Sequence, residues 1–67
     1  MEQATTVTAP KLVAPKEAAG YLGVSEKWLE RDRWAGAKIP YVKIGRHVRY
    51  RMSDLVRFVD ENTEGAA

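Results

Sequence analysis

The stretch AAGYLGVSEKWL, residues 18–29, decides the fold of this 67-residue chain. Gly23 lies between two short patterns of helical spacing, and glycine is the residue type that most often ends a helix in the left-handed conformation. Ser25 is a favoured N-cap for a following helix, and Val24 can pack on Leu29 as a hydrophobic staple. The stretch therefore predicts two short helices joined by a tight turn, which is a helix-turn-helix. An αα-hairpin of another kind can share this spacing.

Both helices have sequence signals at their ends. The first is expected over residues 15–22, because proline suits the first helical position and Glu17 suits the positive end of the helix dipole. Ala14, at its cap position, has no side-chain oxygen and weakens this start. The second helix is expected over residues 26–34, with Leu29 facing inward and charged side chains facing out.

Apolar residues recur at every second position in the segment PYVKIGRHVRYR, residues 40–51. These positions are Val42, Ile44, Val48 and Tyr50. Alternation on both sides of Gly45-Arg46 predicts a β-hairpin with basic side chains on the other faces of its strands. Because a two-stranded hairpin alone is marginal in water, its apolar face is expected to pack on the helices.

A third helix is expected over residues 54–60 or 61, capped by Ser53. It closes the core with apolar residues at helical spacing, which are Leu55, Phe58 and Val59. The predicted fold class is mainly α with a small β-hairpin. It is a winged helix-turn-helix, built from the helix-turn-helix, a two-stranded wing and a C-terminal helix.

Length and composition exclude several classes of protein. A chain this short holds one domain, expected at residues 12–61 between a flexible N-terminal arm, residues 1–11, and a flexible tail, residues 62–67. It has no cysteine and a single histidine, so we expect no disulfide, no metal site and no cysteine nucleophile. Its size excludes a multi-substrate enzyme with a cofactor domain, so we expect no cofactor and no enzymatic activity. It has neither an export signal nor a run of roughly 18 apolar residues, so we expect a cytoplasmic protein without a membrane partner.

Positive charge is concentrated in the middle of the chain. All eleven lysines and arginines lie within residues 11–57 together with only five of the nine acids, a net charge of +6 for that segment. The other four acids lie in the flanks. Such a field favours a polyanionic partner, and ordinary solubility charge is the alternative.

The outward face of the second helix is the first candidate site. If the helix enters the major groove of DNA, lysine or arginine can donate to guanine and glutamate can accept from cytosine. The candidate residues are Ser25, Glu26, Lys27, Trp28, Glu30 and Arg31. The alternative is a solvated face, although like charges four residues apart are slightly destabilising there.

The basic hairpin is the second candidate site and the stronger signal. Residues 38–51 hold five lysines and arginines, one histidine and no acid, which favours a wing laid along a phosphate backbone. The candidate residues are Lys43, Arg46, His47, Arg49 and Arg51. A charged outer sheet face that prevents edge pairing is the alternative, and His47 is as consistent with simple exposure as with a phosphate contact.

The two tryptophans are expected to serve packing more than stacking on bases. Trp28, next to Leu29, is expected to be partly packed. Trp34, at the end of the second helix, is expected to cover the joint to the hairpin.

The order of these residues resembles the excisionase family of small winged helix-turn-helix proteins, which is related to the DNA-binding domain of the MerR regulators. The resemblance covers about residues 13–60. It rests on Glu17-Ala18-Ala19, Leu22-Gly23-Val24-Ser25, Trp28-Leu29, Ile39-Pro40-Tyr41-Val42-Lys43-Ile44-Gly45-Arg46, Val48-Arg49-Tyr50 and Ser53-Asp54-Leu55. The chain departs from the family pattern at Ala14, and Glu30 and Asp32 lower the positive charge of the second helix.

The resemblance implies a recombination directionality factor, bacterial or phage-encoded and nucleoid-associated. Such a protein binds tandem double-stranded DNA sites cooperatively with other copies of itself, bends the DNA and directs a phage-type integrase towards excision. The exposed third helix or the acidic C-terminal end would contact the integrase. No small-molecule ligand is implied. The alternatives are a small MerR-like transcription regulator at a promoter and an adaptor whose basic surface meets an acidic protein.

Overall fold

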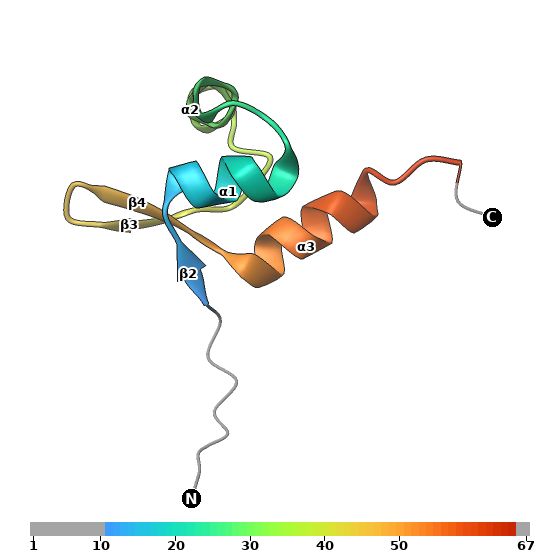
Figure 1. The fold of residues 1–67 in the computed structure, drawn as a ribbon. Helices are drawn as coiled ribbons and strands as arrows, with labels where there is room; N and C mark the ends of the chain where they lie inside the picture. The colour runs from blue at the N-terminus through green and yellow to red at the C-terminus, as the bar shows by residue number, and fades with distance from the viewer. Residues whose placement is uncertain (1–10, 66–67) are drawn as a thin grey trace, which may run out of the picture.

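Three helices and a three-stranded antiparallel sheet form the structure, a computed structural model that describes residues 11–65 (Figure 1). The elements are β2 (Leu12–Val13), α1 (Pro15–Leu22), α2 (Glu26–Trp34), β3 (Val42–Ile44), β4 (His47–Arg51) and α3 (Met52–Glu61). This is the predicted winged helix-turn-helix. The predicted arm (apart from residue 11) and residues 66–67 of the predicted tail lie outside the described residues.

The turn between α1 and α2 has the predicted geometry. Gly23 adopts the left-handed conformation with φ 74°, and its N–H donates to the carbonyl of Ala19 at 2.8 Å. The Oγ of Ser25 accepts from the backbone N–H of Trp28 at 3.0 Å, which caps α2. These two caps let helices of only eight and nine residues begin and end sharply, so α2 has a defined direction on α1.

The predicted start of the third helix is wrong by two residues. Helix α3 begins at Met52, directly after strand β4, and Ser53 lies in its first turn instead of capping it. The reason is tertiary, because the N–H of Met52 donates to the carbonyl of Lys11 at 2.9 Å. That bond continues the ladder between β2 and β4 and satisfies a helix-terminal N–H that would otherwise need a cap.

The predicted two-stranded wing is confirmed as the hairpin of β3 and β4, but the sheet also has a strand that was not predicted. Strand β2 adds a third strand, in the order β2-β4-β3, with Leu12 opposite Arg51 and Val13 opposite Tyr50. Two residues are too few to show an alternating pattern, so no local signal marks this strand. It pairs along the inner half of β4 and leaves the outer half to β3, which forms the projecting hairpin (Figure 1).

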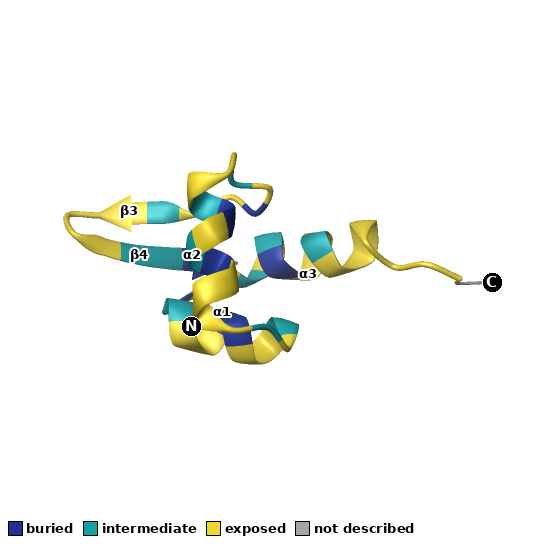
Figure 2. Ribbon diagram, turned by 90° about the horizontal axis from the view of Figure 1, so that it is seen from above, coloured by how far each residue is buried: buried dark blue, intermediate teal, exposed yellow. Residues whose placement is uncertain are grey.

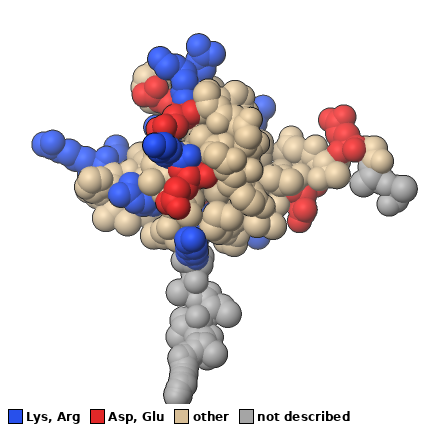
Figure 3. Space-filling view, viewed as in Figure 1, with Lys and Arg blue, Asp and Glu red and all other residues tan. Residues whose placement is uncertain are grey.

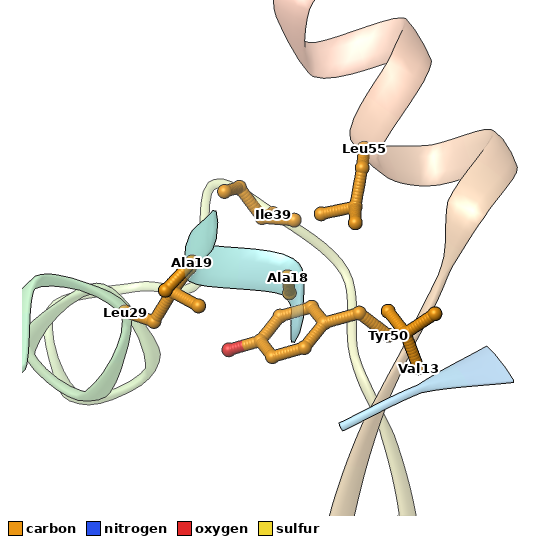
Figure 4. Close-up of a cluster of buried hydrophobic side chains, with 7 residues drawn as sticks. All are labelled: Val13, Ala18, Ala19, Leu29, Ile39, Tyr50 and Leu55. Carbon is orange, nitrogen blue, oxygen red and sulfur yellow. The ribbon is translucent and has the colours of Figure 1, made fainter. Parts of the chain in front are cut away.

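The core lies where all three helices meet the root of the sheet (Figure 2). Its buried apolar residues are Val13, Ala18, Ala19, Leu29, Ile39, Tyr50 and Leu55. The ring of Tyr50 extends from β4 past Ala18 towards Leu29, and the two alanines of α1 leave it room (Figure 4). Phe58 packs on this cluster as expected, whereas Val59 remains 41% exposed because α3 runs outward beyond the core.

Asp32 anchors the loop that leads from α2 to the hairpin. Its carboxylate is buried and accepts two backbone N–H groups, from Lys38 at 3.3 Å and from Ile39 at 3.1 Å. Its backbone carbonyl accepts from Ala37 at 2.7 Å. Asp32 lowers the positive charge of α2 as a whole, as expected, but it lies away from the outward face of the helix. It holds the loop against the helix.

Replacing Asp32 with alanine should lower the free energy of unfolding by about 2 kcal/mol, because a buried N–H loses its charged acceptor. Urea denaturation followed by circular dichroism measures the change. Glu30→Ala is the matched control, since it removes the same charge from the same helix, and it should stay within about 0.5 kcal/mol of the parent. Equal losses in the two variants would show that the hydrogen bonds of Asp32 do not stabilise the fold.

Candidate nucleic-acid interface

The outward face of α2 brings three of the predicted contact residues together. Leu29 and Asp32 are the buried residues of this helix. Helical spacing places Lys27, Glu30 and Arg31 on the opposite side, where all three side chains reach solvent. Two cations and one carboxylate thus share one face, which can donate to guanine and accept from cytosine in a major groove.

The other predicted residues of α2 have different positions. The hydroxyl of Ser25 is engaged as the cap. Glu26 lies at the edge of the outward face, in a groove that it lines together with Pro15 of α1, Lys27, Glu30 and Arg33. Trp28 is 40% exposed and partly packed, as predicted, with its ring 6.2 Å from that of Phe58. It therefore lies on the α3 side of the helix and outside the outward face.

Trp34 does not cover the joint to the hairpin, so that prediction is wrong. Its side chain is 79% exposed. Gly36 and Ala37 both have positive φ, at 116° and 51°, and turn the chain back towards Asp32 and the buried Ile39. These residues close the joint and leave Trp34 uncovered.

Trp34 is also the residue of this face that the sequence reasoning missed. It follows Lys27 by seven positions and Arg31 by three, so all three lie on one side of α2. The helical spacing was the available signal, and it was outweighed by the general tendency of tryptophan to pack.

The register of the wing separates its basic residues into two groups. Lys43 pairs with Val48, Ile44 with His47 and Val42 with Arg49. Directly paired residues share a face of the sheet, so Lys43 lies on the side of Val48 and Tyr50, which faces the helices. His47, Arg49 and Arg51 lie on the other side.

The same register overturns the expectation of one apolar hairpin face. Val42 and Ile44 lie on the side opposite Val48 and Tyr50, and Ile44 is 51% exposed. The cause is the two-residue turn of Gly45 and Arg46, in which the φ of 60° at Gly45 fits a type II′ hairpin. A two-residue loop fixes Ile44 opposite His47 and thereby all further pairs.

The basic side chains of the wing differ in their hydrogen-bond and ion-pair partners within the protein. Nη1 of Arg49 donates to the carbonyl of Val48 at 2.7 Å, and Nη1 of Arg51 lies 3.2 Å from the carboxylate of Asp54. Within residues 11–65, Arg46 at the tip and Lys43 make no ion pair and are exposed. Among the lysines and arginines of the wing, these two therefore have the charge that no partner in the described residues already engages.

Charge is distributed unevenly along the molecule. Basic side chains lie at the hairpin end, acidic and basic side chains are mixed over α1 and α2, and acidic side chains lie at the far end of α3 (Figure 3). The acids of that far end are Asp60, Glu61 and Glu64. A polyanion is therefore attracted to the wing side and repelled from the end of α3.

Two features are absent from the described part of the chain. No group of three or more metal-ligating side chains occurs within residues 11–65. None of the helices in that range has the length and the apolar content needed to cross a bilayer.

A helix-turn-helix with an outward basic face and a projecting basic hairpin defines a winged helix-turn-helix domain, a class that binds double-stranded DNA. Residues 12–63 match the helix-turn-helix domain family, and the chain belongs to that family. Membership implies DNA as the partner. A search of curated proteins finds no match to the chain.

Proposed function

We propose that this protein is an excisionase-type architectural factor, which acts by binding DNA and catalyses no reaction. In this proposal it binds tandem sites cooperatively, bends the DNA and directs a phage-type integrase towards excision of an integrated element. Its place of action is the cytoplasm, on the nucleoid. A small MerR-like regulator that acts at a promoter is the alternative.

The observation that carries the proposal is the separation of two surfaces. The wing tip and the outward face of α2 offer cations to DNA, while α3 extends away from the core on another side (Figures 1 and 3). That helix exposes Val56 and Val59, at 44% and 41%, beside its acidic end. An architectural factor needs both a DNA surface and a free surface for a protein partner.

Each element has a separate role in this proposal. Lys27, Glu30 and Arg31 contact base edges in the major groove and supply sequence preference. Lys43 and Arg46 contact phosphates and supply affinity on any sequence. Because a single module of this kind buries only about 600–1,000 Å² of protein surface, tight binding needs several copies on adjacent sites.

A footprint across the source locus, in a protein concentration series, tests the proposal. Adjacent repeated sites that fill together beside an attachment junction are expected. A single protected site over a promoter would favour the regulator. No protected DNA at moderate salt would overturn both, and the basic surface would then be assigned to an acidic protein partner.

Arg46→Ala should weaken binding several-fold and to the same extent on every duplex, because it removes one phosphate contact. The slope of log affinity against log salt should become shallower by about 0.9. Titrations by fluorescence anisotropy at several salt concentrations measure this slope. Arg57→Ala on α3 removes the same charge far from the wing and should leave the slope unchanged. An unchanged slope for Arg46→Ala would remove the wing tip from the interface.

A further inference from the structure

We propose that Trp34 is a DNA-backbone contact, with its indole ring against a deoxyribose and its Nε1–H donated to a phosphate at the rim of the major groove. This inference rests on the proposed binding of DNA by the outward face of α2. It extends that surface to a residue at the C-terminal end of the helix.

Exposure is the first observation behind the proposal. Trp34 is 79% exposed, whereas Trp28 on the same helix is 40% exposed and packs on Phe58. Among residues 11–65, Trp34 forms neither an aromatic pair nor a cation–π contact. The fold therefore gains almost nothing from this large ring, and its apolar area remains available to a partner.

Position along the helix selects the backbone as the target. Trp34 lies seven residues after Lys27, which is about 10 Å along the helix axis. The major groove is about 12 Å wide, and the first half of a recognition helix contacts the bases. A residue about 10 Å further along the same face has crossed most of the groove width and reaches the sugar–phosphate rim.

The local chain geometry leaves the indole uncovered. The turn at Gly36 and Ala37, held by the 2.7 Å hydrogen bond from the N–H of Ala37 to the carbonyl of Asp32, turns the following chain back towards the buried side of α2. The indole N–H is a donor without acceptor capacity, so a phosphate oxygen is a suitable partner for it. The ring itself supplies apolar contact with the sugar.

Two single-tryptophan proteins test the proposal by fluorescence. Trp28→Phe retains only Trp34, and Trp34→Phe retains only Trp28. On addition of a duplex that contains the footprinted site, acrylamide quenching of Trp34 should fall at least twofold, while that of Trp28 should stay the same. If the Trp28→Phe protein binds the duplex with parent affinity and Trp34 remains equally quenchable, the inference fails and the proposed function stands. If neither the parent protein nor the two variants bind DNA, the inference and the proposed function both fail.

Affinity measurements separate a backbone contact from a base contact. Trp34→Ala should bind all duplexes about tenfold more weakly, as truncation of an interface tryptophan commonly does. Because no charge is removed, the salt slope should stay at the parent value, unlike that of Arg46→Ala. Trp34→Phe retains a ring without the N–H and should lose about half as much on a logarithmic scale. A loss confined to particular base pairs, or none at all with the fold intact by circular dichroism, would overturn the proposal.

Discussion

Leu29→Ala should leave the protein largely unfolded at room temperature. Leu29 of α2 is completely buried, in the cluster that contains Ala18 and Ala19 of α1 and the ring of Tyr50 (Figure 4). Truncation of a buried leucine costs about 2–5 kcal/mol, because transfer energy is lost and a cavity remains. A domain of this size rarely has more than about 3–5 kcal/mol of net stability, so the loss consumes most of it. Loss of helical circular dichroism at 25 °C is the measurement.

Leu12→Ala is the matched control for this variant. It makes the same chemical change at a leucine that is 42% exposed on strand β2. It should cost less than about 1 kcal/mol, because much of its apolar surface is already in water. If both variants unfold alike, or both remain folded, burial of Leu29 does not hold the helix pair together.

The double variant Lys27→Ala with Arg31→Ala should lose affinity for the footprinted site by at least about 30-fold. Its loss of affinity for unrelated DNA should be smaller. Each good contact to a base edge contributes about 1–3 kcal/mol of discrimination, so the double variant loses at least about 2 kcal/mol. Both side chains are on the outward face of α2 and make no ion pair within the described residues. The change should therefore leave the thermal midpoint close to that of the parent. Competition titrations with specific and random duplexes give the ratio of affinities.

Arg46→Ala is the comparison for the double variant, since its loss should be uniform over sequences. Equal losses of the double variant on specific and random DNA would move Lys27 and Arg31 from base recognition to phosphate contact. Arg57→Ala, on α3, controls for the change in overall charge and should affect neither duplex.

Local chemistry explains why the helix-turn-helix could be predicted. Gly23 at the helix end and Ser25 at the next helix start act within four residues of themselves, so the chain order alone carries their effect. The outward cations Lys27 and Arg31 follow directly from helical spacing around the buried Leu29. The same reasoning found the basic tip of the wing, because Gly45-Arg46 is a two-residue turn between alternating strands.

Long-range contacts explain what could not be predicted. The start of α3 depends on a hydrogen bond from the N–H of Met52 to the carbonyl of Lys11, forty-one positions earlier in the chain. Strand β2 forms only because Leu12 and Val13 pair with β4. The two sides of the wing depend on the pairing register, because a shift of one residue would exchange them.

The sequence by itself therefore determined the class of fold, the bounds of α1 and α2 and the basic character of the wing, since these depend on neighbours along the chain. Only the tertiary structure decided that Lys43 and Arg49 lie on opposite sides, that Asp32 holds a loop and that Trp34 is exposed. The physical reason is that exposure and hydrogen-bond partners depend on which distant segments occupy the neighbouring space.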